Sequence, residues 1–196
     1  MTRTDDADTG RLGVQVEVWP LAADRYGIWL VSPEGDAWRS DLLAADTEPH
    51  RAVQEVLRGH DGHPAAAAGA LDAVRLVHST SWRTDRAGGD NAVVLTYVAV
   101  LGGHGLVGGG GDMEFVRDVW SDARPLTLEV SDAVGKPHNR SPIEPPTPRY
   151  IDVLMHGVRH LRFLLDTDAQ ATAALDDHWR DHLRNLEPAL AGMYQP

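Results

Sequence analysis

The pattern of hydrophobic and polar residues near the start of the chain predicts β-strands. In residues 14–18 (VQVEV) valines alternate with Gln15 and Glu17, the period-two pattern of a strand with one wet face. Further strands are expected at 26–31 and 37–43, because the proline and glycine between them are typical of a turn. Together these segments predict an antiparallel meander.

Two stronger strands are expected further along, at 74–83 and 92–101. Strict alternation along the first would place His78 and Trp82 on one face and Arg83 on the other. The second, AVVLTYVAVL, is nearly continuous in apolar and β-branched residues, which is typical of a strand covered on both faces. We therefore expect these two strands to be adjacent and to lie inside the sheet.

Three longer helices are predicted from periodicity and capping residues. One is expected at 48–58, followed by Gly59 at the position of a C-terminal glycine cap. The other two are expected at 148–165 and 167–186, and Thr167 is a good N-cap for the last of them. The last two helices predict a C-terminal helical hairpin.

The glycine-rich segment 102–111 contains a G-x-G-x-x-G pattern, which in dinucleotide-binding proteins lies against a pyrophosphate. Three more glycines follow where the helix would have to begin, and each costs about 1 kcal/mol relative to alanine in a helix. We therefore interpret this segment as a flexible loop. A short helix near 113–120 and an edge strand at 126–130 are expected after it.

The order of these elements predicts one α+β domain over residues 13–196, with a mixed, mostly antiparallel sheet, a packed helix and the C-terminal hairpin. The sheet region is expected to cover 13–131 and the hairpin 149–190. Between them, 132–148 is rich in proline and has almost no apolar pattern, so we expect a loop. Residues 1–12 are expected to be a disordered acidic tail.

Charge and cysteine content exclude several classes of function. The chain has a formal net charge of −11 and a single lysine, so neither nucleic acid nor a membrane surface is an expected partner. It has no cysteine, which excludes disulfides, thiolate nucleophiles and iron–sulfur clusters. No apolar run approaches the roughly 20 residues that span a bilayer, and no signal peptide is recognisable. A cytoplasmic location is therefore expected.

Histidines on the two C-terminal helices are candidate metal ligands. His156 and His160 stand at i, i+4 on the first, and His178 and His182 repeat this spacing on the second. The first pair is expected to project away from the apolar stripe of its helix, whereas His182 lies within its stripe. The alternatives are a metal site that uses His156, His160 and His182, or histidines that are simply packed or solvated.

Aromatic residues on neighbouring predicted strands suggest a ligand pocket. Its candidate lining is Trp29, Trp38, His78, Trp82 and Arg83, and its ligand would be a small, flat or nucleotide-like molecule. Core packing explains the tryptophans equally well. For His78 the alternative is a core histidine with its hydrogen bonds satisfied.

The element order over residues 14–130 resembles that of a Nudix domain, with an opening meander, one helix at 48–58 and the strands VRLVHSTSWR and AVVLTYVAVL. Nudix enzymes are α/β/α sandwiches that hydrolyse nucleoside diphosphates linked to another group, using Mg²⁺ held by glutamates of the Nudix helix. That helix should read R-E-x-x-E-E-x-G, whereas RAVQEVLRGHDG keeps only Gln54, Glu55 and Val56. The resemblance implies a fold and a ligand pocket without Mg²⁺-dependent hydrolysis.

These observations favour a non-catalytic ligand-binding or regulatory protein on a Nudix-like scaffold. One alternative is a metal-dependent hydrolase that uses the C-terminal histidines, and another is a structural or protein-interaction module. The helix at 148–165 carries apolar residues all round, including Val153, Phe163 and Leu164, which favours a homodimer through the C-terminal helices.

Overall fold

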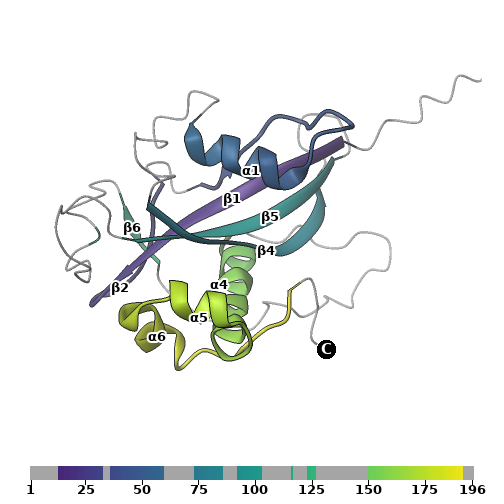
Figure 1. Ribbon diagram of the computed structural model, residues 1–196. Coiled ribbons are helices and arrows are strands. Elements are labelled where there is room, and N and C mark those ends of the chain that lie inside the picture. Colours follow the sequence, from purple (N-terminus) through teal and green to yellow (C-terminus); the bar gives the residue numbers. More distant parts are fainter. Residues whose placement is uncertain are drawn as a thin grey trace, which may run out of the picture.

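The computed structural model describes residues 13–32, 36–59, 73–85, 92–102, 116, 123–126 and 150–191. These residues form a mixed, mostly antiparallel sheet of six strands together with four helices, so the fold is α+β as predicted (Figure 1). The strands are β1 (Gly13–Asp24), β2 (Gly27–Leu30), β3 (Trp38–Arg39), β4 (Val74–Asp85), β5 (Ala92–Leu101) and β6 (Arg124–Pro125).

The sheet has the order β4-β5-β1-β2-β6, with β3 also paired to β1. The pairing of β1 with β5 is parallel and runs from Gly13 opposite Ala92 to Leu21 opposite Val100. All other pairs are antiparallel. The prediction of two adjacent strands is confirmed, but only β5 is interior, because β4 forms one edge of the sheet.

Helices cover both faces of the sheet, as Figure 1 shows, with α1 (Pro49–Arg58) on one side and α4 (Tyr150–Thr167), α5 (Ala169–Ala174) and α6 (Asp177–Leu183) on the other. Each side has its own apolar core. The α1 side contains Val16, Val18, Trp38, Val53 and Leu57, and the α4 side contains Trp19, Leu21, Val98, Leu161 and Trp179. We call these two sides the α1 face and the α4 face.

The helix α1 forms where the sequence predicts it. Pro49 occupies its first turn, and Gly59 ends it with a φ of 79°, a left-handed conformation that glycine adopts without a steric cost. Its apolar stripe is buried against the α1 face, and burial of each larger side chain contributes about 1.5–3 kcal/mol. The buried residues are Ala52, Val53, Val56 and Leu57.

The expected helix at 167–186 is instead two short helices. Asp168, and not Thr167, caps α5 by accepting hydrogen bonds from the N–H groups of Gln170 and Ala171. A second cap follows at once, because the Asp176 carboxylate accepts the N–H of Trp179 and starts α6. Two aspartate caps within ten residues favour two helix starts over one continuous helix.

Two β-bulges in β4 change which side chains share a face. The register with β5 shifts near the start of β4 and again between Ser79 and Ser81. Directly opposed residues of paired strands point to the same face, so His78 and Arg83 lie on the α4 face and Trp82 on the α1 face. The expectation that His78 and Trp82 share a face is therefore wrong, because strict alternation fails at a bulge.

The apolar surface of α4 is covered by its own chain. Val153 and Leu164 are both buried, and Phe163 is half-buried. The all-round apolar pattern therefore reflects packing against the sheet and the segments that follow α4, and the homodimer stays a prediction. None of the helices among the described residues combines the length and the hydrophobicity that a membrane span requires.

Several predicted segments lie outside the described residues. These are the tail 1–12, nearly all of the glycine-rich segment 102–111, the helix at 113–120 apart from Val116, the strand at 126–130 apart from Leu126, and the proline-rich loop 132–148.

Candidate functional site

A buried glutamate lies at the centre of the sheet, on a strand face that was expected to be exposed to solvent. Glu17 on β1 is fully buried on the α4 face. Its neighbours along that face, Trp19 on β1 and Val98 on β5, belong to the apolar core, whereas Glu17 is paired in register with Thr96. The α4 face thus changes from apolar to polar at the same level on both strands.

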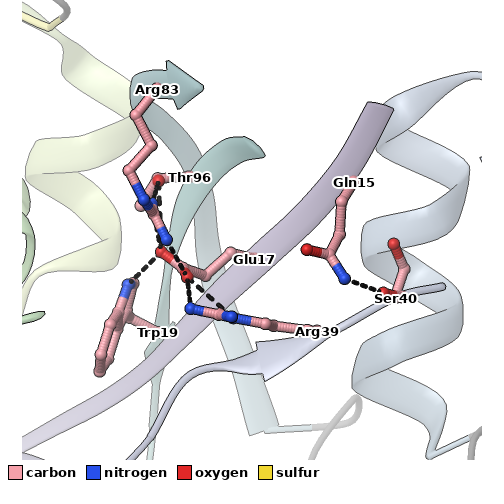
Figure 2. A network of polar contacts seen from close by, with 7 residues as sticks. All are labelled: Gln15, Glu17, Trp19, Arg39, Ser40, Arg83 and Thr96. Carbon is pink, nitrogen blue, oxygen red and sulfur yellow. Dashed lines mark hydrogen bonds and ion pairs between the residues drawn. The ribbon is translucent and has the colours of Figure 1, made fainter. Parts of the chain in front are cut away.

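Side chains from four strands converge on this carboxylate (Figure 2). Glu17 Oε1 accepts hydrogen bonds from Trp19 Nε1 at 3.0 Å, Arg83 Nη1 at 2.9 Å and Thr96 Oγ1 at 3.3 Å. Glu17 Oε2 accepts from Arg83 Nη2 at 2.7 Å and from Arg39 Nε and Nη2 at 3.1 and 2.8 Å. We call Glu17, Trp19, Arg39, Arg83 and Thr96 the Glu17 cluster.

These contacts decide the charge of Glu17. Burial alone raises the pKa of a carboxyl group, but the hydrogen bonds and positive charges of Arg83 and Arg39 outweigh it, together with the Trp19 N–H. The net result is a pKa below the ordinary value of a glutamate. Glu17 is therefore an anion at neutral pH, and both of its oxygens are occupied by donors.

The two arginines are fixed by short contacts and reach toward solvent to different extents. The side chain of Arg83 is 11 % exposed and that of Arg39 is 27 % exposed. Arg83 holds Glu17 through two parallel N–H···O bonds, and its Nη1 also donates to Thr96 Oγ1 at 3.1 Å. Because a guanidinium is a planar fork of donors, such a bidentate contact fixes its orientation as well as its position.

The five residues of the sequence-predicted pocket do not gather at one place. His78 and Arg83 lie on the α4 face, whereas Trp29, Trp38 and Trp82 lie on the α1 face. Trp38 is buried in the core beneath α1, and Trp82 is 63 % exposed at the edge strand. Of the five, only Arg83 belongs to the Glu17 cluster.

The histidines form a second polar group, between α4 and β4. The ring of His160 lies 5.1 Å from that of His78 and stacks on Phe163 at 5.7 Å. His160 is 3 % exposed, contrary to the expectation that it projects away from the core. Its Nδ1 lies 2.9 Å from the carbonyl oxygen of Ala189, which assigns the N–H to Nδ1, and its buried Nε2 has no hydrogen-bond partner among the described residues.

The three proposed metal ligands are not brought together. His182 on α6 bonds to the backbone carbonyl of Asp24 at 2.7 Å and so holds α6 against the β1–β2 hairpin. His156 and His160 instead face β4, where His156 bonds to the backbone of Thr80. Within the described ranges no group of three or more histidine or acidic side chains has the geometry to hold a metal ion.

Burial lowers the pKa of each histidine in the group between α4 and β4. For His78 and His156 the positive charge of a protonated His160 lowers the pKa further, and Arg159 adds to the effect on His156. Asp168 raises the pKa of His78, and the contact with Ala189 raises that of His160, but neither reverses the direction. The neutral form of these histidines is therefore favoured at neutral pH.

The Mg²⁺ that a Nudix resemblance would imply does not fit the residues of α1. Its one carboxylate, Glu55, accepts a hydrogen bond from Arg51 at 3.2 Å on the solvent side of the helix. Mg²⁺ in proteins is bound by carboxylate oxygens together with water or phosphate. A single carboxylate that is already paired with an arginine is a poor ligand set.

The Glu17 cluster was largely missed by sequence reasoning, which assigned Glu17 to a wet face. One local signal existed: Thr96 interrupts an otherwise apolar strand and Glu17 interrupts a run of valines. A polar residue inside a strand that is otherwise buried needs a partner. The partners themselves, 22 and 66 residues away from Glu17, could not be identified from the spacing.

Comparison with known proteins gives no relative. No protein-family model, no curated protein and no solved structure matches the chain.

Proposed function

We propose that this chain is a non-catalytic ligand-binding or regulatory protein on a Nudix-like scaffold, with the Glu17 cluster as its recognition centre. The observation that carries the proposal is the state of Glu17, a buried and ionised carboxylate whose two oxygens are both occupied by donors. The cytoplasmic location and the homodimer belong to the same proposal.

The occupied carboxylate argues for binding and against acid–base chemistry. A general base must offer a lone pair to the substrate proton and have a pKa near the working pH. Glu17 has neither property, because Arg39 and Arg83 hold its pKa below the ordinary value and their N–H groups cover Oε2. Its role in this proposal is to orient the two guanidinium groups.

Fixed side chains favour ligand binding because little conformational freedom is lost when the ligand arrives. Arg83 is held by Glu17 and Thr96, and Arg39 by Glu17, on strands of one sheet. A recognition site built on strands is more rigid than one built on loops. The cluster meets this requirement with residues from β1, β3, β4 and β5.

A thermal-shift screen of the full chain against nucleotides and sugar nucleotides tests the proposal. A ligand present at a hundred times its Kd stabilises the folded state by about 2.7 kcal/mol, which is a measurable rise in Tm. Each hit is then incubated with the protein and followed by phosphorus NMR. Binding without turnover is expected, whereas the absence of any hit, or steady turnover of a hit, would contradict the proposal.

The hydrolase alternative receives less support from the described residues. It needs His156, His160 and His182 at one ion, and these lie in two different environments. Elemental analysis of the purified protein tests it directly, since stoichiometric zinc, iron or manganese would favour a metal-dependent enzyme over a binding protein.

A further inference from the structure

The strand β4 forms a long edge of the sheet. It is 12 residues long, and among the described residues it pairs only with β5. The opposite edge is β6, a strand of two residues that ends in Pro125. A very short strand with a proline is a poor template for a further strand, whereas a long edge presents a row of N–H and C=O groups that another strand can bind. The two edges of this sheet therefore differ in what they can pair with.

The two β-bulges of β4 limit the part of this edge on which a further strand can pair. The register with β5 is continuous over residues 76–79 and again over residues 81–85, and it shifts between these two runs. The second run has the length of a typical strand. Its Arg83 is turned onto the α4 face and held by Glu17, so this charge is compensated within its own chain. The run 81–85 is therefore suited to pairing with a neighbour.

A large aromatic side chain is exposed on the same run. Trp82 is 63 % exposed on the α1 face, and beside it on β5 lie the half-buried side chains of Leu95, its partner in register, and Tyr97. The helix α1 packs mainly on β1 and β3, away from this part of the face. Tryptophan and tyrosine are enriched at protein interfaces. We call the run 81–85 together with Leu95 and Tyr97 the β4 edge surface.

The distribution of charge favours a second copy of the chain at the β4 edge surface. The chain has 29 acidic and 18 basic residues, so two copies repel each other over most of their surfaces. Before Asp85, β4 contains two arginines and no acidic residue, and β5 contains no charged residue. Two copies can therefore approach at this edge without bringing many carboxylates together.

We infer that two copies of this chain form a homodimer by antiparallel pairing of their β4 strands about a two-fold axis at Trp82. This inference rests on the homodimer of the proposed function and names its surface, in place of the C-terminal helices. The axis sets the Trp82 side chains of the two copies opposite each other, and Ser81 of each copy opposite Arg83 of the other. An axis at Arg83 would place like charges opposite each other, which is unfavourable. A two-fold axis also closes the assembly at two copies.

Size-exclusion chromatography with light scattering of the full chain measures the assembly. We expect wild type to have twice the mass of one chain at micromolar concentration. In Trp82→Lys the aromatic anchor is replaced by a charge that lies opposite its own copy, so the dimer dissociation constant should rise at least about thirtyfold. Leu42→Lys changes another exposed apolar side chain and should keep the wild-type dimer. Thermal unfolding checks that both variants fold, as expected for substitutions at exposed positions.

Hydrogen exchange locates the interface. Wild type is measured above and below its dimer dissociation constant, and the amides of residues 81–84 should exchange more slowly in the dimer, because strand pairing protects N–H groups at the edge. The amides of α4 and α6 should exchange equally in both samples. Protection confined to the C-terminal helices would overturn the pairing through β4.

Failure of the inference differs from failure of the proposed function. A Trp82→Lys dimer as tight as that of wild type would overturn the β4 interface while leaving a homodimer in place, and assembly beyond two copies would overturn the two-fold axis. A wild-type monomer at every concentration would remove the homodimer and this inference together. Ligand binding is judged separately by the thermal-shift screen, because a monomer can still give a hit.

Discussion

The guanidinium of Arg83 on β4 donates two hydrogen bonds to the carboxylate of Glu17 on β1, with N···O distances of 2.9 and 2.7 Å. The strand β5 lies between these two strands in the sheet. The two residues are 66 positions apart in the sequence. This pair joins the edge of the sheet to its centre on the α4 face.

Removing the charge of Glu17 should destabilise the protein strongly. In Glu17→Gln the guanidinium groups of Arg39 and Arg83 lose their buried counter-ion, and breaking a buried pair from one side costs about 3–5 kcal/mol. Urea unfolding measures the change. Glu55→Gln, which removes the exposed partner of Arg51, is the matched control and should cost under about 0.5 kcal/mol. Equal losses in the two variants would contradict a structural role for the cluster.

Acid should weaken the fold in two steps, the first due to histidine. The pKa of His160 is lowered in the folded state. Above the unfolded-state pKa of about 6.5, His160 is unprotonated in both the folded and the unfolded state, so its titration does not reduce the free energy of unfolding. As the pH falls below about 6.5 the unfolded state takes up the proton first, and stability decreases by up to about 1.4 kcal/mol per pH unit for this residue.

The pH dependence of urea unfolding between pH 7.5 and 5 measures this first step. His160→Asn keeps an N–H that can reach Ala189 and does not titrate, so the slope should become shallower. An unaltered slope in His160→Asn would show that the buried histidine does not carry the effect.

The second step belongs to Glu17 and begins at lower pH. Its folded-state pKa is lowered, so the stabilisation is complete above the unfolded value of about 4.3 and disappears as the pH falls through the folded value. In Glu17→Gln this low-pH loss should be smaller, because the pKa of Asp24 is also lowered and its share remains, while the histidine step is kept. Fluorescence-detected unfolding of both proteins between pH 5 and 2.5 separates the two steps.

A glycine sets how closely α4 approaches the sheet. A Cβ at Gly157 would lie 2.9 Å from Val98 Cγ1 and 3.6 Å from Thr80 Cγ2. Although alanine favours a helix by about 1 kcal/mol over glycine, overpacking of a stiff, buried valine costs about 1–3 kcal/mol, so Gly157→Ala should be destabilising. Gly27→Ala has open space around the new Cβ and serves as the control.

A double-mutant cycle checks the cause of this effect. Val98→Ala removes the methyl group that the new Cβ would meet, so the two substitutions together should cost less than the sum of the single changes. Additive costs would show that Gly157 matters for a reason other than its contact with Val98.

Asp24 should hold the β1–β2 hairpin and Val116 together. Its Oδ1 accepts the N–H groups of Tyr26 and Gly27, and its Oδ2 accepts the N–H of Val116 at 3.0 Å. Burial opposes ionisation, but these hydrogen bonds, that of Val116 first, bring the pKa of Asp24 below its ordinary value. Asp24→Asn places an amide N–H₂ against a backbone donor and should cost about 1–3 kcal/mol.

Hydrogen exchange checks the Asp24 prediction locally. The amide of Val116 should exchange faster in Asp24→Asn than in wild type, while amides at the centre of β5 keep their relative protection. Unchanged protection at Val116 would mean that this contact does not anchor Val116.

Elements with a local signal could be predicted from the amino-acid sequence. The apolar run of β5, the stripe and glycine cap of α1, and the apolar face of α4 depend on side-chain periodicity and on turn chemistry within a few residues. These features were sufficient for the α+β class and for the adjacency of β4 and β5. The division of the last helix was also encoded locally, because Asp168 and Asp176 are both N-caps. Thr167, which is also a good N-cap residue, was instead expected to begin one continuous helix.

The candidate site, in contrast, forms from residues that come together when the chain folds. The alternating pattern predicted that Glu17 faces solvent, whereas it is buried in the structure. The strands β3 and β4 place Arg39 and Arg83 beside its carboxylate, and their positive charges offset the cost of burying it. The bulge between Ser79 and Ser81 is a feature of the pairing of β4 with β5, and it places Arg83 rather than Trp82 on the α4 face. Periodicity predicts which residues of a strand share a face. Whether a charged residue on that face can be buried depends on partners that are distant in the chain.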